Sequence, residues 1–332
     1  MAPTDKKAST SLGRWYFRCC SERRRGTCIR TDGNSGCASM PYLVMGRIDK
    51  AWRSAIFAAV MFALEKGADA FIHTVIRKNV RPQETEAGYW DRHWDRQRED
   101  FRQHGVPLET RDAWWKNLYD EMADHYEHAL DGVAGKRICE LGAGSGFASL
   151  LLAKRGATIT LVDFSPNSHA YAKELASYYS VPRERVAFQL QDMLSAAVPT
   201  DRADVVWNCG VIEHYAWPDA VRMVRTMAAH AKPGGTVMVT LPNLLSPELI
   251  YRMCAEGKGT EIFFSHRMLR RLMEEAGLQN VRVAPINYWV PSFLPHAWAN
   301  RMRRSSFGRR LAGLCWLFNG IGTVPNDSSA HP

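Results

Sequence analysis

The 332-residue sequence contains no apolar run long enough to cross a bilayer. Its richest apolar stretch, Ala55–Leu64, stops at Glu65 and Lys66 and is about half of the ~20 residues that a membrane-spanning helix needs. Residues Ala51–Lys78 have apolar side chains at helical spacing, which predicts an amphipathic helix. No apolar run follows the first basic residues, as a secretory signal requires. We therefore expect a cytoplasmic protein without a transmembrane segment. Packing of this helix on the rest of the chain is the default interpretation, and contact with a membrane surface or formation of a homodimer stays open.

The sequence also lacks the paired Cys-x-x-Cys pattern of zinc sites. Four of its eight cysteines lie in a leader rich in Ser, Arg and Gly, with a spacing that matches no common zinc pattern: Cys19, Cys20, Cys28 and Cys37. The other four lie in apolar surroundings, which favours buried, reduced thiols: Cys139, Cys209, Cys254 and Cys315. We expect no metal site.

The net charge of +9 belongs mainly to the two ends of the chain. Residues 1–40 are rich in lysine and arginine, and a second basic cluster consists of Arg301, Arg303, Arg304, Arg309 and Arg310. We interpret these basic ends as solvated tails rather than as a surface that binds nucleic acid or a membrane.

The middle of the chain alternates between strand and helix patterns, which is typical of a parallel sheet covered on both faces. Strands are expected at residues 137–141, 158–163, 186–192, 203–208, 236–241 and 281–284. Ser165 and Ser265 are expected to cap helices, with Pro166 as the first residue of one and Gly277 at the end of the other. We divide the chain into a flexible leader (1–40), a helical N-terminal region that forms a cap (41–134), a doubly wound α/β domain (135–286) and a C-terminal extension (287–332).

Ligands of such sheets bind beyond the carboxyl ends of the strands. The first strand leads into Gly142-x-Gly144-x-Gly146, where glycines permit a sharp turn and a close approach to a ligand. Asp163 follows the second strand, and a carboxylate about 20 residues beyond such a loop accepts hydrogen bonds from ribose hydroxyls. Asp192 follows the third strand and can accept from an adenine amino group, with Met193 as an apolar wall.

Glu140 helps to distinguish a dinucleotide cofactor from a cofactor that carries an amino acid. It directly precedes the glycine loop, where it would repel a pyrophosphate and attract the ammonium of an amino acid. The spacing of the glycines also departs from the Gly-x-Gly-x-x-Gly loop of dinucleotide sites. These features favour an adenosine ligand that carries an amino acid.

Six parts of the sequence resemble successive motifs of the class I S-adenosylmethionine-dependent methyltransferases over roughly residues 115–286: Glu140–Gly146, Asp163, Gln191–Met193, Asp204–His214, Lys232–Gly235 and Ser265–Gly277. The pair Glu213-His214 is similar to the branch that contains the ubiquinone- and menaquinone-pathway enzymes. The resemblance implies a Rossmann-like, mostly parallel sheet with S-adenosyl-L-methionine as cofactor. It also implies a seventh, antiparallel strand, which is not obvious after Ala284. Two alternatives stay open: Leu314–Phe318 forms this strand, or the strand is missing.

The resemblance further implies which residues bind the cofactor. The methionine part would be held by Glu140, Gly142, Ala143, Gly144 and Gly146. The ribose would be bound by Asp163, the adenine by Phe164, Asp192 and Met193, and the floor beneath the sulfonium would be formed by Asn208 and Cys209.

A general base is needed only if the attacking atom carries a proton of high pKa. The candidates are His214 and Glu213, with His266 as a third. The start of a helix after the fourth strand would keep His214 neutral, because positive charge is unfavourable there. The alternative is that Glu213 and His214 merely open this helix.

Aromatic residues flank the α/β domain and are expected around the acceptor's entrance: Tyr89, Trp90, Trp94, Trp114, Trp115 and Tyr119 before it, and Phe263, Phe264, Tyr288, Trp289 and Phe293 after it. Such walls suit an apolar or aromatic small-molecule acceptor, and O-methylation is favoured. Each of them can equally belong to the core of the helical cap. No nucleic-acid partner is expected, because no Asn/Asp-Pro-Pro-Tyr run or Pro-Cys pair follows the fourth strand. The alternatives are a non-catalytic cofactor-binding regulator and an RNA methyltransferase.

Overall fold

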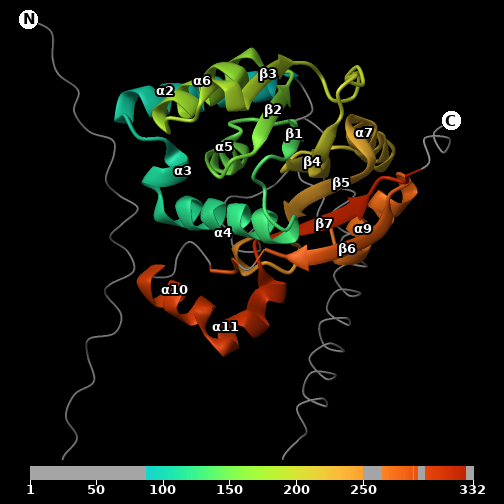
Figure 1. Ribbon diagram of the computed structural model, residues 1–332. Helices are drawn as coiled ribbons and strands as arrows, with labels where there is room; N and C mark the ends of the chain where they lie inside the picture. Colours follow the sequence, from blue (N-terminus) through green and yellow to red (C-terminus); the bar gives the residue numbers. More distant parts are fainter. Residues whose placement is uncertain (1–86, 250–263, 287, 291–295, 327–332) are drawn as a thin grey trace, which may run out of the picture. The chain divides into compact units, whose positions relative to one another are not determined.

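The computed structural model of the chain describes residues 87–249, 264–286, 288–290 and 296–326 (Figure 1). Our expectations for the leader 1–40, the helix 51–78, Cys254, Phe263 and Phe293 lie outside these residues. Within the described part, every helix is too short or too polar to span a bilayer.

Within the residues that the structure describes, seven strands form one sheet in the order β3-β2-β1-β4-β5-β7-β6. β1, β2, β3, β4 and β5 pair in parallel, and only β7 runs antiparallel to its neighbours. The strands are β1 (Arg137–Leu141), β2 (Thr158–Asp163), β3 (Val186–Leu190), β4 (Ala203–Cys209), β5 (Ala231–Pro242), β6 (Gln279–Pro285) and β7 (Leu317–Thr323). This is the doubly wound, mostly parallel sheet that the alternating pattern predicted.

The seventh strand differs from the segment expected for it. We expected this strand at Leu314–Phe318. It begins instead at Leu317 and continues to Thr323, and it includes Asn319, Gly320 and Gly322. Glycine and asparagine are rare in strands, which hides this one in the sequence. The reason for glycine is packing: a Cβ at Gly320 would lie 2.9 Å from Leu269 Cδ2 of the covering helix. The C-terminal extension thus contributes an inner strand of the sheet.

Helices cover both faces of the sheet (Figure 1). One core forms where α4, α5 and α6 pack on residues such as Ile138, Leu161 and Trp207, and a second where α7 and α9 pack on Val206 and Val239. The helices are α2 (Ala87–His104), α3 (Leu108–Arg111), α4 (Ala113–Ala129), α5 (Phe147–Lys154), α6 (Pro166–Tyr178), α7 (Trp217–His230), α9 (His266–Glu275), α10 (His296–Arg304) and α11 (Ser306–Arg310), with short 3₁₀ turns η2 (Arg183–Arg185), η3 (Ile212–His214) and η4 (Leu311–Leu314).

The caps that begin these helices fix where the loops leave the sheet. Ser165 accepts a hydrogen bond from Ser168 N at 3.0 Å, and Ser265 accepts one from Met268 N at 3.2 Å, so both predicted N-caps are confirmed. Asp112, which was not singled out in the sequence, caps α4 by accepting from Trp114 N at 2.7 Å.

Candidate functional site

A cavity opens at the carboxyl ends of β1, β2 and β4. Its empty volume is about 840 Å³, including the open space at its mouth. It is lined by Trp90, Trp94, Tyr119, Met122, Glu140, Gly142, Ala143, Gly144, Ser145, Phe147, Ala148, Asp163, Phe164, Trp207, Cys209, Gly210, Val211, His214 and Tyr215. Residues far apart in the sequence therefore meet at the edge where parallel strands place ligands.

The glycine loop is fixed by hydrogen bonds to the second strand. Gly142 N and Ala143 N both donate to Val162 O, at 2.8 and 3.1 Å, and Gly144 N donates to Asp163 Oδ2 at 2.8 Å. Gly144 has φ +53°, in the left-handed region that other residues rarely adopt. A Cβ atom at this position would point into the indole of Trp94. The need for glycine here comes from the backbone conformation and from this aromatic neighbour.

Asp163 links the loop to the start of α6. Its carboxylate is 6% exposed and also accepts a hydrogen bond from Ser165 N at 2.9 Å. Burial raises the pKa of this carboxyl, and the backbone N–H groups of Ser165 and Gly144 lower it. Each carboxylate oxygen has a second lone pair, so Asp163 can accept further hydrogen bonds from a ligand in the cavity.

Glu140 is a buried carboxylate with unused hydrogen-bonding capacity. It is 4% exposed, and its Oε2 atom has no hydrogen-bond partner among the described residues. Burial raises the pKa of Glu140 to about 8, opposed by a hydrogen bond from Ser149. A buried carboxylate of this kind is stabilised by a cation that binds beside it.

Helix α2 closes the cavity from outside the sheet. Trp90 and Trp94 line it, and the helix lies along α6 (Figure 1). Asp91 binds the beginning of α6, because its Oδ1 accepts from Ser165 Oγ at 2.6 Å and from Asn167 N at 3.1 Å. Asp91 was not predicted, since nothing in its local sequence marks it as a partner of a helix 74 residues away.

Two ion pairs hold the second half of α2. Arg98 Nε and Arg102 Nη2 both contact Glu174 Oε1 on α6, at 2.8 and 2.7 Å. Contacts through Asp91 and through Glu174 therefore hold both halves of α2 against α6, and this fixes the two tryptophans that line the cavity.

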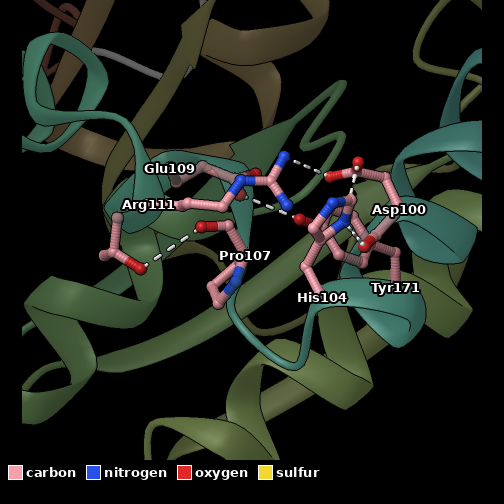
Figure 2. Close-up of polar contacts among 7 residues, drawn as sticks. Asp100, His104, Pro107, Glu109, Arg111 and Tyr171 are labelled. Carbon is pink, nitrogen blue, oxygen red and sulfur yellow. Dashed lines mark hydrogen bonds and ion pairs between the residues drawn. The ribbon is translucent and has the colours of Figure 1, made fainter. Parts of the chain in front are cut away.

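The corner between α2 and α3 contains a further buried carboxylate (Figure 2). Arg111 Nη2 lies 2.8 Å from Asp100 Oδ2, which joins α3 to α2. Glu109, which is 7% exposed, accepts a hydrogen bond from Tyr171 OH at 2.8 Å. Burial raises the pKa of Glu109, and hydrogen bonds from Tyr171 and from Ser145 of the glycine loop lower it. The corner is therefore connected directly to the loop.

His214 lies in the cavity, opposite Trp90. The two rings meet edge to face with centroids 5.1 Å apart. His214 ends the 3₁₀ turn η3, and α7 begins only at Trp217, so His214 is not at an α-helix N-terminus as we expected. The pKa of His214 is lowered to about 4, and the cause is burial, which disfavours the charged ring. His214 is thus neutral as expected, but the cause is burial and not the N-terminus of a helix.

Not all of the predicted site residues line the cavity. Glu140, Gly142, Ala143, Gly144, Asp163, Phe164, Cys209 and His214 do, whereas Gly146, Asp192, Met193, Asn208 and Glu213 do not. Gly146 faces Leu161 and begins α5, and Met193 belongs to the core of the α7 side. Asp192 closes its own turn by accepting from Leu194 N at 2.9 Å. His266 packs on Phe318 with centroids 4.8 Å apart, away from the lining.

The flanking aromatic residues divide into wall and core. Tyr119 joins Trp90 and Trp94 in the wall. Trp114 is 2% exposed, packs on Tyr288 and donates from Nε1 to Val290 O at 2.7 Å. Phe264, Tyr288 and Trp289 are also buried. Sequence reasoning missed Trp207 and Tyr215 as wall residues. Trp207 directly precedes Asn208, and Tyr215 directly follows His214. Their positions next to these predicted site residues are the signal that could have identified them.

Comparison with known proteins agrees with this geometry. A family model described as a methyltransferase domain matches residues 114–283. The ubiquinone biosynthesis O-methyltransferase of Coxiella burnetii is 28% identical over 193 residues, covering 53% of this chain and 80% of the relative. That of Aeromonas salmonicida is 28% identical over 170 residues, covering 47% of this chain and 68% of the relative.

Among solved structures, the chain is similar to the magnesium protoporphyrin IX methyltransferase of Synechocystis PCC 6803 with bound SAH. The identity is 16% and the TM-score 0.47, with 66% of this chain and 88% of that chain covered. The family match spans β1 to β5, most of β6 and the glycine loop, and β7 lies beyond it. The chain belongs to the class I S-adenosylmethionine-dependent methyltransferases.

Proposed function

We propose that this enzyme transfers the methyl group of S-adenosylmethionine to an oxygen atom of a small apolar or aromatic molecule. The observation that carries the proposal is the place of His214, a buried neutral histidine in the same cavity as Glu140 and the glycine loop. The names of the relatives, which are O-methyltransferases of ubiquinone biosynthesis, support the same choice of atom.

The cavity fits the cofactor by charge. Its described lining contains the carboxylates of Glu140 and Asp163 and neither lysine nor arginine. S-adenosylmethionine bears two positive groups, an ammonium and a sulfonium, against one carboxylate. Glu140 Oε2, buried and without a described partner, would accept from the ammonium, and Asp163 would accept from the ribose hydroxyls. Phe164 would cover the adenine. Asp192, Met193, Asn208 and Cys209 keep their proposed roles at the adenine edge and the floor.

When bound, the cofactor supplies an electrophilic methyl group on a positively charged sulfur. The protein must align the acceptor oxygen with this group and exclude water. Trp90, Trp94 and Tyr119 would exclude water, because they line the cavity with aromatic surface. Because Trp90, Trp94 and Tyr119 come from the segment before β1, we propose that this segment serves as the cap on the acceptor side.

His214 would take the proton of an acceptor hydroxyl. With a pKa lowered to about 4 by burial, its ring is neutral at physiological pH, and a neutral imidazole has one nitrogen that can accept a proton. A base with so low a pKa is weak, so it suits a phenol better than an alkanol, because the phenol's proton leaves more readily as the oxygen attacks. Planar phenols also fit walls made of indole rings.

The test compares His214→Asn with the natural protein on a panel of catechols and other phenols, with transfer of a radiolabelled methyl group as the readout. We expect kcat to fall roughly 10²- to 10⁴-fold while the Kd for S-adenosylmethionine stays within about twofold. A decrease in kcat of less than about tenfold would contradict a role for His214 as the base. It would indicate an acceptor that needs no base, such as an amine, a thiol or an already ionised phenol.

The alternative is a protein that binds the cofactor without catalysis and acts on a partner. Methyl transfer into a metabolite extract, followed by mass spectrometry, distinguishes the two. The enzyme produces new methylated species that disappear in His214→Asn, and a regulator produces none.

A further inference from the structure

The C-terminal part of the chain has a one-sided charge. Between Glu275 and Asp327 the sequence contains no acidic residue and six arginines: Arg282, Arg301, Arg303, Arg304, Arg309 and Arg310. Five of these six fall within ten residues, on α10 and α11 or between them. Such a segment is attracted to a polyanionic surface.

The two helices present these charges together with an apolar ring. Arg301, Arg304, Arg309 and Arg310 are exposed, and none forms an ion pair with a described residue. Phe307 is 57% exposed and lies three residues from both Arg304 and Arg310. Ser305 fixes the corner between the helices by accepting from Gly308 N at 3.1 Å and donating to Met302 O at 2.5 Å. The corner between the two helices therefore presents an exposed aromatic ring next to exposed guanidinium groups.

The topology places this segment at the edge of the sheet that carries the cavity. β7 is antiparallel to both β5 and β6, so β6 runs in the same direction as β5 and ends at the same edge as β1 and β2. The segment that bears α10 and α11 leaves the sheet there. It is also tied to the wall of the cavity, since Trp114 of α4 donates to Val290 O and α4 carries Tyr119 and Met122.

We propose that α10 and α11 dock on the surface of an anionic lipid bilayer, with the arginines at the headgroups and Phe307 inserted at the boundary with the acyl chains. Exposed basic residues that attract anionic headgroups, together with an exposed aromatic side chain that can enter the boundary region, are the features of segments that bind such interfaces. A duplex nucleic acid would also attract the arginines, but its phosphate backbone offers no apolar surface to the aromatic ring of Phe307. Docking at this edge would bring the entrance of the cavity close to apolar molecules dissolved in the membrane.

This inference goes beyond the proposed methyl transfer and does not depend on it, because vesicle binding is measured on the full chain without cofactor or acceptor. The probe is sedimentation with vesicles of phosphatidylglycerol and phosphatidylcholine in equal parts, compared with vesicles of phosphatidylcholine alone. We expect binding to the mixed vesicles, little to the neutral ones, and weaker binding as salt is raised.

Two variants test which residues are responsible. Arg309→Glu/Arg310→Glu should weaken binding to the mixed vesicles at least about 30-fold, which corresponds to about 1 kcal/mol for each arginine removed. Phe307→Ala should weaken it about fivefold without changing its salt dependence. The matched control is Arg183→Glu/Arg270→Glu, which changes the net charge equally at two exposed positions on η2 and α9 and should bind nearly as well as the natural protein.

Three results would overturn the proposal. One is an absence of binding to anionic vesicles at low salt, and another is an equal loss in the control, which would make the effect one of net charge alone. The third is a Phe307→Ala variant that binds vesicles unchanged while Arg309→Glu/Arg310→Glu loses affinity for a duplex RNA, which would assign the surface to nucleic acid. Methyl transfer to a detergent-dispersed acceptor should be unchanged in all variants, so a failure of the proposed function is seen separately.

Discussion

The indole of Trp94 lies directly against Gly144, the middle glycine of the cofactor loop. A methyl group at position 144 would overlap the six-membered ring of Trp94, and the backbone there has φ +53°. The loop therefore depends on a residue that lies 50 positions earlier, outside the segment matched by the family model. Helix α2 and the glycine loop form one structural unit.

Gly144→Ala should lower the free energy of unfolding by about 2–4 kcal/mol, through backbone strain and through the overlap with Trp94. Trp94→Ala removes only the overlap, so the double variant should recover about 1–2 kcal/mol relative to the sum of the single changes. Urea unfolding of the four proteins measures this. Strict additivity would mean that the two residues do not interact.

Asp91 attaches α2 to the start of α6. Asp91→Ala leaves the Ser165 hydroxyl and the N–H of Asn167 without this acceptor, and it should cost about 1 kcal/mol, as the loss of a helix cap does. Hydrogen exchange should become faster in α2 and remain unchanged in β1 and β4. The exposed Asp95→Ala on the same helix is the control, and an equal effect there would contradict a specific role for Asp91.

Glu140 should make stability depend on pH. Its pKa is raised in the folded protein to about 8 from 4.5, mainly by burial, so the folded state holds this proton more tightly than the unfolded state. The stabilising contribution is complete below about pH 4.5 and is lost as the pH rises towards 8, by at most about 1.4 kcal/mol per pH unit. Glu140→Gln cannot ionise, so its stability relative to the natural protein should increase between pH 5 and pH 8. Denaturant titrations at several pH values test this, and a constant difference would be the contrary result.

The pH dependence of catalysis should report on the burial of His214. If this residue is the base, activity requires its neutral form, and a pKa of about 4 keeps activity constant as the pH falls from 8 to about 5. Trp90→Ala opens the cavity beside the imidazole and should move the acidic limit of kcat/KM upward, towards the ordinary histidine value of about 6.5. Trp90→Phe keeps an apolar cover and should keep the low limit. Identical profiles in all three proteins would show that His214 does not titrate in the rate.

Asp163 should matter for the cofactor far more than an ordinary surface carboxylate. Asp163→Ala removes a charged acceptor from the cavity and should weaken binding of S-adenosylmethionine by at least about 1 kcal/mol and by several at most. Calorimetric titration gives the affinity, and Asp219→Ala on α7 is the matched control. Unchanged affinity in Asp163→Ala, or tighter binding of NAD than of S-adenosylmethionine, would contradict the assignment of the cofactor site.

Local signals in the sequence determined most of the sheet and the loop at its edge. β1 and β2 have the expected boundaries because short apolar runs followed by glycine or by a capping serine leave few alternatives. The same local chemistry predicted the N-caps Ser165 and Ser265, and it placed Glu140 and Asp163 at neighbouring strand ends.

Only the tertiary structure decided the rest, because it depends on contacts between distant residues. β7 contains glycines that look unsuited to a strand until their neighbours are seen: Gly320 lies against α9, and Gly322 lies against Leu278 and Val281. The tryptophans of α2 could equally have been core or wall, and Asp91 and Glu174 settle this by attaching the helix to α6. His214 is neutral because surrounding side chains exclude water, and no local pattern measures how deeply a side chain will be buried.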